Sequence, residues 1–84
     1  MESHYQTLRT LYEIVKHEPR PETYLCRPRE LILRLMQDWN IITTHLTMLK
    51  EEKLIRTRQL DTMFISITVA GIEKVNTPVI RQNS

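Results

Sequence analysis

The order of helix and strand in this chain can be worked out from the stretch Ile42-Thr43-Thr44-His45-Leu46-Thr47-Met48-Leu49-Lys50-Glu51-Glu52-Lys53-Leu54-Ile55. Its apolar residues Ile42, Leu46 and Leu49 recur at intervals of four and three, the spacing that places side chains on one face of an α-helix. The acidic residues and the aliphatic pair that follow lack this spacing. We therefore expect a helix over about 39–52 with one buried face.

Beyond this helix the sequence pattern becomes strand-like. Residues 54–59 and 63–69 are rich in the β-branched and aromatic side chains that favour strands, and the short polar-tipped segment 60–62 between them predicts a turn. These segments together predict a β-hairpin. We expect Gly71 to end its second strand and residues 72–75 to form one more helical turn.

A first helix is predicted at the other end of the chain, from Ser3 to about Glu18. Ser3 suits its N-cap, and apolar residues recur at helical intervals: Tyr5, Leu8, Leu11, Tyr12 and Val15. Pro19 and Pro21 stop this helix, since proline lacks the N–H that a helix interior requires. The connector that follows has the composition of a very short strand at residues 23–25.

A second helix is predicted from Pro28, which fits the first helical position because its missing N–H would have no partner there. Residues 31–36 are apolar except for Arg34, which predicts a helix buried on most of its circumference. Two interpretations of residues 28–52 stay open. An unbroken helix agrees with the four-and-three spacing of Leu31, Leu35, Trp39, Ile42, Leu46 and Leu49. A break agrees with Asp38, a good N-cap for a helix that starts at Trp39.

Length and composition bound the function. A chain of 84 residues is one domain's worth, and 40% hydrophobic with 26% charged residues predicts a folded domain with a small core. We expect the domain over residues 1–76 and a flexible tail over 77–84. A formal net charge of +2 permits nucleic-acid binding without requiring it.

Several classes of function are disfavoured by what the sequence lacks. Cys26 is the single cysteine, so the chain has no internal disulfide and no cysteine zinc site, and its one glycine excludes a phosphate-binding loop. His4, His17 and His45 show no metal-ligand spacing. Cys26 follows no catalytic pattern, although the neighbouring Arg27 would lower its pKa somewhat. We expect neither an enzyme nor a cofactor. We expect a cytoplasmic protein without a membrane partner, because the chain has neither a long apolar run nor a signal peptide.

Two separated motifs resemble the winged helix-turn-helix family. The run 42–55 is similar to the recognition helix of that family and the exit from it. The run Phe64-Ile65-Ser66-Ile67-Thr68-Val69-Ala70-Gly71 resembles its second wing strand and the terminal Leu-Thr-x-x-Gly, with Ile67 in place of leucine. The resemblance covers about Tyr5 to Val75. It implies a mainly α fold with a small β-hairpin (α+β), in which three helices are followed by a two-stranded wing.

The sequence departs from the family pattern at three places. Lys53 stands where the family commonly has a left-handed glycine at the helix end, and Met36-Gln37 stand in place of the familiar glycine of the turn. The wing tip is short and carries Asp61 rather than a basic or glycine-rich loop, which does not favour insertion into the minor groove.

The resemblance also implies a function: sequence-specific binding of double-stranded DNA by a small transcriptional regulator, acting as a homodimer. The third helix, at about 39–52, would enter the major groove, where Asn40 suits a bidentate contact with adenine. The predicted base contacts are Asn40, Thr43, Thr44 and Thr47. The predicted phosphate contacts are Arg27, Arg29, Lys50, Arg56 and Arg58. The spacing of two between Arg56 and Arg58 predicts that they lie on the same face of the first strand.

Each of these predictions has an alternative. The polar face of the third helix is also what a solvated helix face looks like, and Arg56 and Arg58 also suit a charged sheet edge that resists aggregation. A different function, docking on a protein partner without DNA binding, is indicated by Trp39, Ile41 and Met48, since aromatic and methionine side chains are enriched at protein interfaces. Trp39 also lies on the core stripe and suits a core position.

Overall fold

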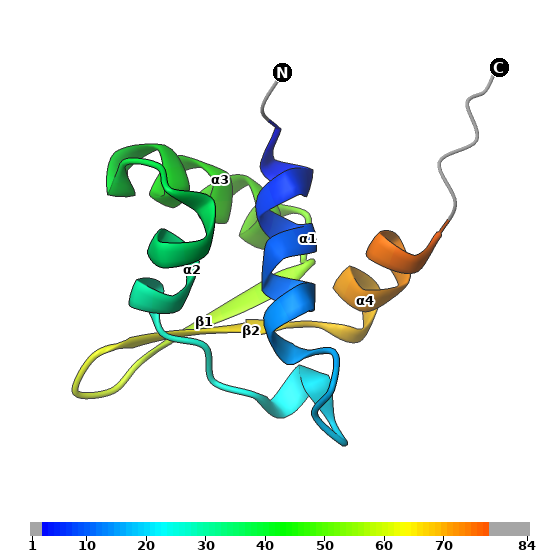
Figure 1. Ribbon diagram of the computed structural model, residues 1–84. Coiled ribbons are helices and arrows are strands. Elements are labelled where there is room, and N and C mark those ends of the chain that lie inside the picture. The colour runs from blue at the N-terminus through cyan, green and yellow to red at the C-terminus, as the bar shows by residue number, and fades with distance from the viewer. Residues whose placement is uncertain (1–2, 78–84) are drawn as a thin grey trace, which may run out of the picture.

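The computed structural model describes residues 3–77 and contains, over that range, four α-helices, one 3₁₀ helix and a two-stranded antiparallel hairpin (Figure 1). The fold class is therefore mainly helical with a β-hairpin, as predicted. In chain order the elements are α1 (His4–Val15), η1 (Pro21–Thr23), α2 (Pro28–Leu35), α3 (Trp39–Glu51), β1 (Ile55–Gln59), β2 (Met63–Ile67) and α4 (Val69–Asn76). None of these helices is long and apolar enough to cross a membrane. The predicted tail begins at Thr77, and its residues 78–84 lie outside the described range.

Helix α1 is the centre of the arrangement, because it contacts α2, α3 and α4 (Figure 1). The hairpin runs along one side of the helices, and α4 lies on the far side of α1 from α2. The predicted helical stripes of α1 and α3 are confirmed as core faces, except at Tyr5, which is 38% exposed. The buried apolar residues are Leu8, Leu11, Val15, Cys26, Leu31, Ile42, Leu46, Leu49, Leu54, Ile55, Ile65 and Ile67. Helix α1 ends at Val15, three residues before the predicted end at Glu18.

Residues 28–52 form two helices rather than one. Helix α2 ends at Leu35, and Met36 adopts the left-handed backbone conformation (φ 56°, ψ 39°), which turns the chain before α3 begins at Trp39. Asp38 is the N-cap of α3, as predicted. Its backbone carbonyl accepts from the N–H groups of Ile41 and Ile42 at 3.0 and 3.1 Å, whereas its side chain makes no capping bond.

The prediction that α2 is buried on most of its circumference is wrong. Only Leu31 is fully buried, Leu35 packs against the core, and Leu33 is 67% exposed. The reason is geometric, since Leu33 lies about 200° around the helix from Leu31 and a single neighbouring layer cannot cover both. The short α2 presents one face to the core and an apolar residue to solvent.

The connector between α1 and α2 contains no strand at residues 23–25, although its composition would suit one. Pro21–Thr23 form a 3₁₀ helix, whose end is held by the Thr23 hydroxyl donating to the Arg20 carbonyl at 2.7 Å. Strand-like pairing occurs one residue beyond the predicted segment, at Cys26. The Cys26 N–H donates to the Ile65 carbonyl at 2.9 Å, and the Ile65 N–H donates back at 2.8 Å. Cys26 therefore extends the hairpin on the β2 side by a single bridge.

The exit from α3 into β1 is a glycine-type helix end built with a lysine. Lys53 has φ 63°. The N–H of Leu54 donates to the Leu49 carbonyl at 3.0 Å, and the N–H of Lys53 donates to the Lys50 carbonyl at 3.0 Å. These are the two bonds of the Schellman motif. The family-like helix end is thus formed here without glycine. The hairpin follows at once, in the register Ile55↔Ile67 to Gln59↔Met63, with the predicted turn at 60–62.

The prediction that Gly71 ends the second strand is wrong. Strand β2 ends at Ile67, and Thr68 is the N-cap of α4, with its side-chain oxygen accepting from the Gly71 N–H at 2.9 Å. Gly71 lies inside α4 because that helix crosses close to the end of α3. A Cβ atom at this position would collide with the carbonyl oxygen of Leu54.

Replacement of Gly71 by alanine tests this close approach. In an open helix the change would stabilise by about 1 kcal/mol through helix propensity. We expect Gly71→Ala instead to destabilise the protein by about 1–3 kcal/mol, the usual cost of overpacking, as measured by urea unfolding. Glu73→Ala, at an exposed position of the same helix, is the control and should change stability by less than about 0.5 kcal/mol. A stabilised Gly71→Ala variant would contradict the packing of α4 described here.

Candidate nucleic-acid interface

The outer face of α3 carries the predicted base-contacting residues. Ile42, His45, Leu46 and Leu49 are its buried residues, and this inward face leaves the opposite side open. Asn40, Thr44 and Thr47 are exposed, and Thr43 is half-buried at the border of the face. The four predicted residues therefore lie on the solvent side of one helix, as the spacing indicated.

The three threonine hydroxyls on this face are already hydrogen-bonded within the helix. Thr43 and Thr44 donate to the Asn40 carbonyl at 2.9 and 3.0 Å, and Thr47 donates to the Thr43 carbonyl at 3.0 Å. Their oxygens remain available as acceptors, but donation to a base would require rotation of the side chain. Asn40, which carries both donors and an acceptor, is the residue of this face best suited to reading a base edge.

A groove lies between α3 and the hairpin. It has a volume of about 170 Å³ and is lined by Thr43, Leu46, Thr47, Lys50, Thr57 and Met63. The structure thus brings Thr43, Thr47 and Lys50 together beside the hairpin. Asn40 and Thr44 are not among the groove residues and lie further round α3.

The hairpin arginines lie on the other face of the sheet. Arg56 is paired with Ser66 and Arg58 with Phe64, and both arginines are exposed, whereas the alternate residue Ile55 is buried. The predicted shared face of Arg56 and Arg58 is confirmed by this register. These arginines line a second groove of about 430 Å³ together with Glu22, Thr23, Leu25, Thr57 and Ser66.

Arg27 joins the hairpin arginines, whereas Arg29 does not. The Arg27 guanidinium lies 6.0 Å from the centre of the Phe64 ring, and Phe64 is the cross-strand partner of Arg58. Arg29 is exposed on α2 and does not line the groove of the hairpin arginines. The predicted phosphate contacts therefore form one group on the hairpin, a lysine beside the α3 groove and a separate arginine on α2.

These cations are not neutralised by carboxylates of the described chain. Over residues 3–77 the ion pairs are His4–Glu52 and Lys16–Glu13. Arg27, Arg29, Lys50, Arg56 and Arg58 take part in neither. Glu22 is the one acidic residue that shares a groove with Arg56 and Arg58. The hairpin side of the molecule therefore carries more positive charge than the net charge of the chain suggests.

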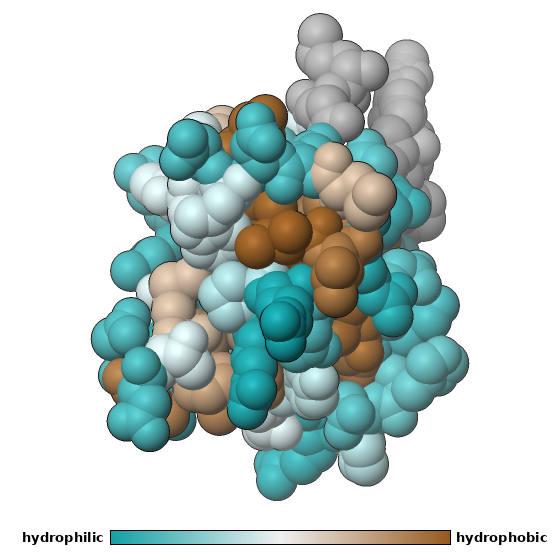
Figure 2. Space-filling view, turned by 60° about the vertical axis from the view of Figure 1, so that its left-hand side comes forward, coloured by the Kyte–Doolittle hydropathy of each residue, from teal (hydrophilic) through white to brown (hydrophobic). Residues whose placement is uncertain are grey.

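The residues predicted for a protein interface are divided by the structure. Trp39 is half-buried and packs against the core, as the core interpretation predicts. Ile41 and Met48 are 44% and 40% exposed, and their spacing of seven residues places them on the same side of α3. Figure 2 brings the side with α2, α3 and the hairpin tip forward, and apolar residues form separate patches there among hydrophilic ones.

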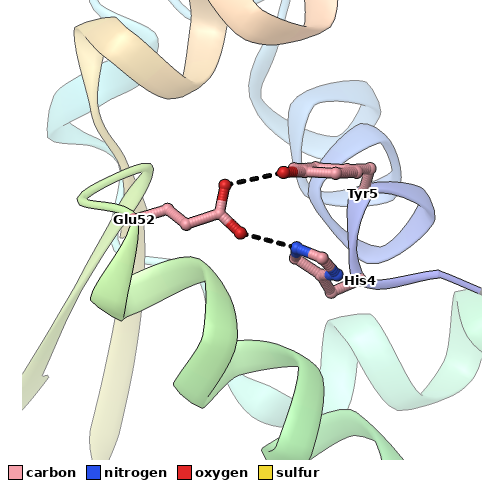
Figure 3. Close-up of polar contacts among 3 residues, drawn as sticks. All are labelled: His4, Tyr5 and Glu52. Carbon is pink, nitrogen blue, oxygen red and sulfur yellow. Dashed lines mark hydrogen bonds and ion pairs between the residues drawn. The ribbon is translucent and has the colours of Figure 1, made fainter.

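A polar cluster at the α1–α3 junction had no signal in the sequence. The carboxylate of Glu52 accepts from the Tyr5 hydroxyl and from His4 Nε2, each at 2.7 Å (Figure 3). The Lys74 ammonium lies 4.8 Å from the centre of the Tyr5 ring, so the cluster also reaches α4. Glu52 is 48 positions from His4 and 47 from Tyr5 in the sequence, so no local pattern connects it with them. The cluster fixes the direction in which Glu52 leaves the end of α3.

The electrostatics of this cluster follow from its hydrogen bonds. The bond from Tyr5, and then that from His4, lowers the pKa of the Glu52 carboxyl, because both donors favour the charged form. The same bond to Glu52 raises the pKa of the Tyr5 hydroxyl.

Deeper in the same helix pair, Thr7 Oγ1 and His45 Nδ1 form a buried hydrogen bond of 2.8 Å. His45 is thus a satisfied core histidine.

Cys26 is a core residue rather than a reactive thiol. Its burial raises the pKa of the thiol to about 12, with a further increase from nearby Glu30. The expectation that Arg27 lowers this pKa is wrong, because removal of the thiolate from water outweighs any nearby positive charge. No group of three or more His, Cys, Asp or Glu side chains in residues 3–77 is placed to hold a metal ion.

Comparisons with protein-family models, with curated proteins and with solved structures yield no match to this chain. Functional conclusions therefore rest on the geometry above and on the motifs of the sequence.

The Glu52 cluster makes the stability of the protein dependent on pH. A carboxyl whose pKa is lowered on folding stabilises the native state above its ordinary pKa of 4.5, and this contribution is lost as the pH falls through the lowered value. We expect Glu52→Gln to lower the urea midpoint at neutral pH, and we expect the difference from the unmodified protein to shrink as the pH falls below 4.5. Glu51→Gln, at the adjacent exposed position, should leave the midpoint nearly unchanged at every pH. A Glu52→Gln difference that is independent of pH would exclude the cluster as its cause.

Proposed function

We propose that this protein is a winged helix-turn-helix DNA-binding regulator that inserts α3 into the major groove and holds phosphates with the arginines of its hairpin. The observation that carries the proposal is the pairing of a solvent-facing polar helix, α3, with a hairpin whose cations are unneutralised. The polar face of α3 borders the groove beside the hairpin, and the exposed arginines lie on the other face of the same two-stranded sheet. The resemblance of the two sequence motifs to that family also supports the proposal.

The link between α2 and α3 supports the helix-turn-helix part of the proposal. Two helices are joined by a turn of three residues, 36–38, as is usual for this motif, in which the turn often contains glycine. Here the left-handed Met36 supplies the conformation that glycine usually provides. The order of α1, α2, α3 and hairpin is also the order that the family resemblance implies.

The polar groups of α3 and the hairpin support the DNA-binding part. Asn40 is exposed, has no competing side-chain hydrogen bond among the described contacts and suits adenine N6 and N7. Thr43, Thr47 and Lys50 share the groove beside the hairpin, where a backbone strand and base edges would both be within reach. One domain of this size reads only a short half-site, so we propose that the regulator acts as a homodimer with its two α3 helices about 34 Å apart.

Selection of binding sites from random duplexes tests the proposal directly. If about four of the five predicted phosphate contacts form, the slope of log affinity against log salt concentration should be near −4. Arg56→Gln combined with Arg58→Gln should reduce the magnitude of that slope by about 2. Asn40→Ala should remove about 1–3 kcal/mol of discrimination at one base pair while leaving the salt slope unchanged. Arg9→Gln, in the groove between α1 and α4, is the matched control and should change neither quantity. Failure to enrich any sequence over non-specific duplex at low salt would refute the proposal.

A second candidate function is docking on a protein partner, and the exposure of Ile41 and Met48 favours it. They lie on the border of the α3 face nearer to Glu52, away from Thr43 and Lys50 in the hairpin groove. Methionine is enriched at protein interfaces, and charged residues are depleted at the core of such interfaces. This candidate would use α3 without DNA.

Paired substitutions separate the two candidates. If docking is the function, Ile41→Ser with Met48→Ser should abolish recovery of a partner that the unmodified protein retains reproducibly, and Arg56→Gln with Arg58→Gln should not affect it. Leu33→Ser, which removes an exposed leucine from α2, is the control. If the variant with both Ile41→Ser and Met48→Ser still retains the partner, the Ile41–Met48 surface is not the docking site. Urea unfolding of each variant verifies that the fold is intact.

A further inference from the structure

A groove at the C-terminal end of α3 contains residues to which the proposed function gives no role, namely Lys53, Val69 and Ala70. It has a volume of about 410 Å³ and is lined by Lys50, Lys53, Ile55, Arg56, Thr68, Val69 and Ala70. Three elements meet there: the last turn of α3 with its left-handed exit, the start of β1 and the first turn of α4. Three of its seven lining residues are cationic, and none is acidic.

The three cations of this groove are free to meet an anion. Lys50, Lys53 and Arg56 are exposed, and none of them belongs to the ion pairs found over residues 3–77. Two glutamates, Glu51 and Glu52, stand between the lysines in the chain, and neither lines the groove. The carboxylate of Glu52 is turned toward α1 by its bonds to Tyr5 and His4. Three unneutralised positive charges around a concave surface therefore produce a strong local positive potential.

Hydrogen-bond donors lie in the same groove. Val69 and Ala70 are the first two residues of α4, and the N–H groups of a first helical turn have no acceptor within the helix. The Thr68 side chain accepts from the Gly71 N–H, so it satisfies the third residue of the turn and leaves the first two. Thr68 is itself anchored, since its hydroxyl donates to the Lys53 carbonyl at 2.9 Å. This bond holds the lysine-bearing turn and the start of α4 together.

We propose that this groove binds a phosphate group. Guanidinium and ammonium groups combined with backbone N–H groups are the donors that phosphate oxygens require, and the charge of the groove matches a phosphate in sign. The volume of about 410 Å³ leaves room for the rest of a phosphate ester beside the phosphate group. Two sources have the same chemistry, a backbone phosphate of DNA and a small phosphorylated molecule.

The neighbouring surface determines how each source would reach the groove. Lys50 also lines the groove between α3 and the hairpin, so a duplex bound by α3 would bring a backbone phosphate alongside. A small phosphate ester would enter from solvent without DNA. Lys53, Val69 and Ala70 belong to neither the base-contacting nor the phosphate-contacting set of the proposed function, and they therefore report on this groove alone.

The first arm of the test uses no DNA. The ¹⁵N-labelled protein is titrated with inorganic phosphate and with a nucleoside monophosphate, and potassium chloride of matched ionic strength is the reference. We expect saturable shifts of the Lys53, Val69 and Ala70 amide signals with phosphate but not with chloride. Lys53→Gln and Arg56→Gln should each weaken binding about two- to fivefold, the range for one exposed charged contact. Lys16→Gln, at an exposed lysine of the turn after α1, should not change it.

The second arm uses duplex DNA and Lys53→Gln. If a backbone phosphate occupies the groove, this variant should reduce the magnitude of the salt slope by about 0.9, and Lys16→Gln should not. A response in this arm, with or without the first, assigns the groove to the DNA backbone. A response in the first arm alone assigns it to a small phosphate ester, and this holds even if the protein binds no DNA and the proposed function fails. The absence of a response in both arms overturns the phosphate site.

Discussion

Packing of α1 against α3 is the interaction on which the rest of the structure depends. Leu8 and Leu11 of α1 belong to the same buried cluster as Ile42 and Leu49 of α3, and each such side chain contributes about 1.5–3 kcal/mol when it is fully buried. Apolar contact alone would allow α3 to rotate slightly about its axis. The buried Thr7–His45 hydrogen bond (2.8 Å) restricts that rotation, because a buried polar group that loses its partner costs about 1–3 kcal/mol. The orientation of the outer face, and with it every property proposed for α3, follows from this inward face.

The two ends of α3 are set by residues in an uncommon backbone conformation. Met36 before the helix and Lys53 after it both have positive φ, which costs a residue other than glycine about 1–2 kcal/mol. Both side chains are exposed, so no side-chain burial offsets that cost at either position. The residues on either side offset it, since Leu31 and Ile42 flank the first turn in the core and Leu54 follows the second. The core thus imposes two chain reversals that local propensity does not favour.

The distribution of charge matters more than its total. A net charge of +2 describes a nearly neutral chain, yet the described ion pairs use none of the cations around the hairpin. Lys50 lines both the α3–hairpin groove and the groove at the start of α4, and Arg56 lines the latter and the groove beside the connector. Two side chains therefore connect three concave surfaces into one basic region. The Glu52 cluster contributes indirectly, because it directs the carboxylate of Glu52, which precedes Lys53 in the chain, toward α1.

The sequence alone determined the element types and most of the inward faces. Helical spacing predicted the core residues of α1 and α3, and β-branched runs with a polar turn predicted the hairpin and the shared face of Arg56 and Arg58, because both patterns are local. Tertiary structure decided what depends on contacts between distant segments. It placed Gly71 inside a helix, since α4 passes the Leu54 carbonyl too closely for a Cβ, and it gave Cys26 a bridge to Ile65. It exposed Leu33, because α2 has a neighbour on one side only, and it joined His4, Tyr5 and Glu52. The groove of Lys50, Lys53 and Arg56 at the start of α4 is of the same kind, because three segments must meet before their charges share one surface.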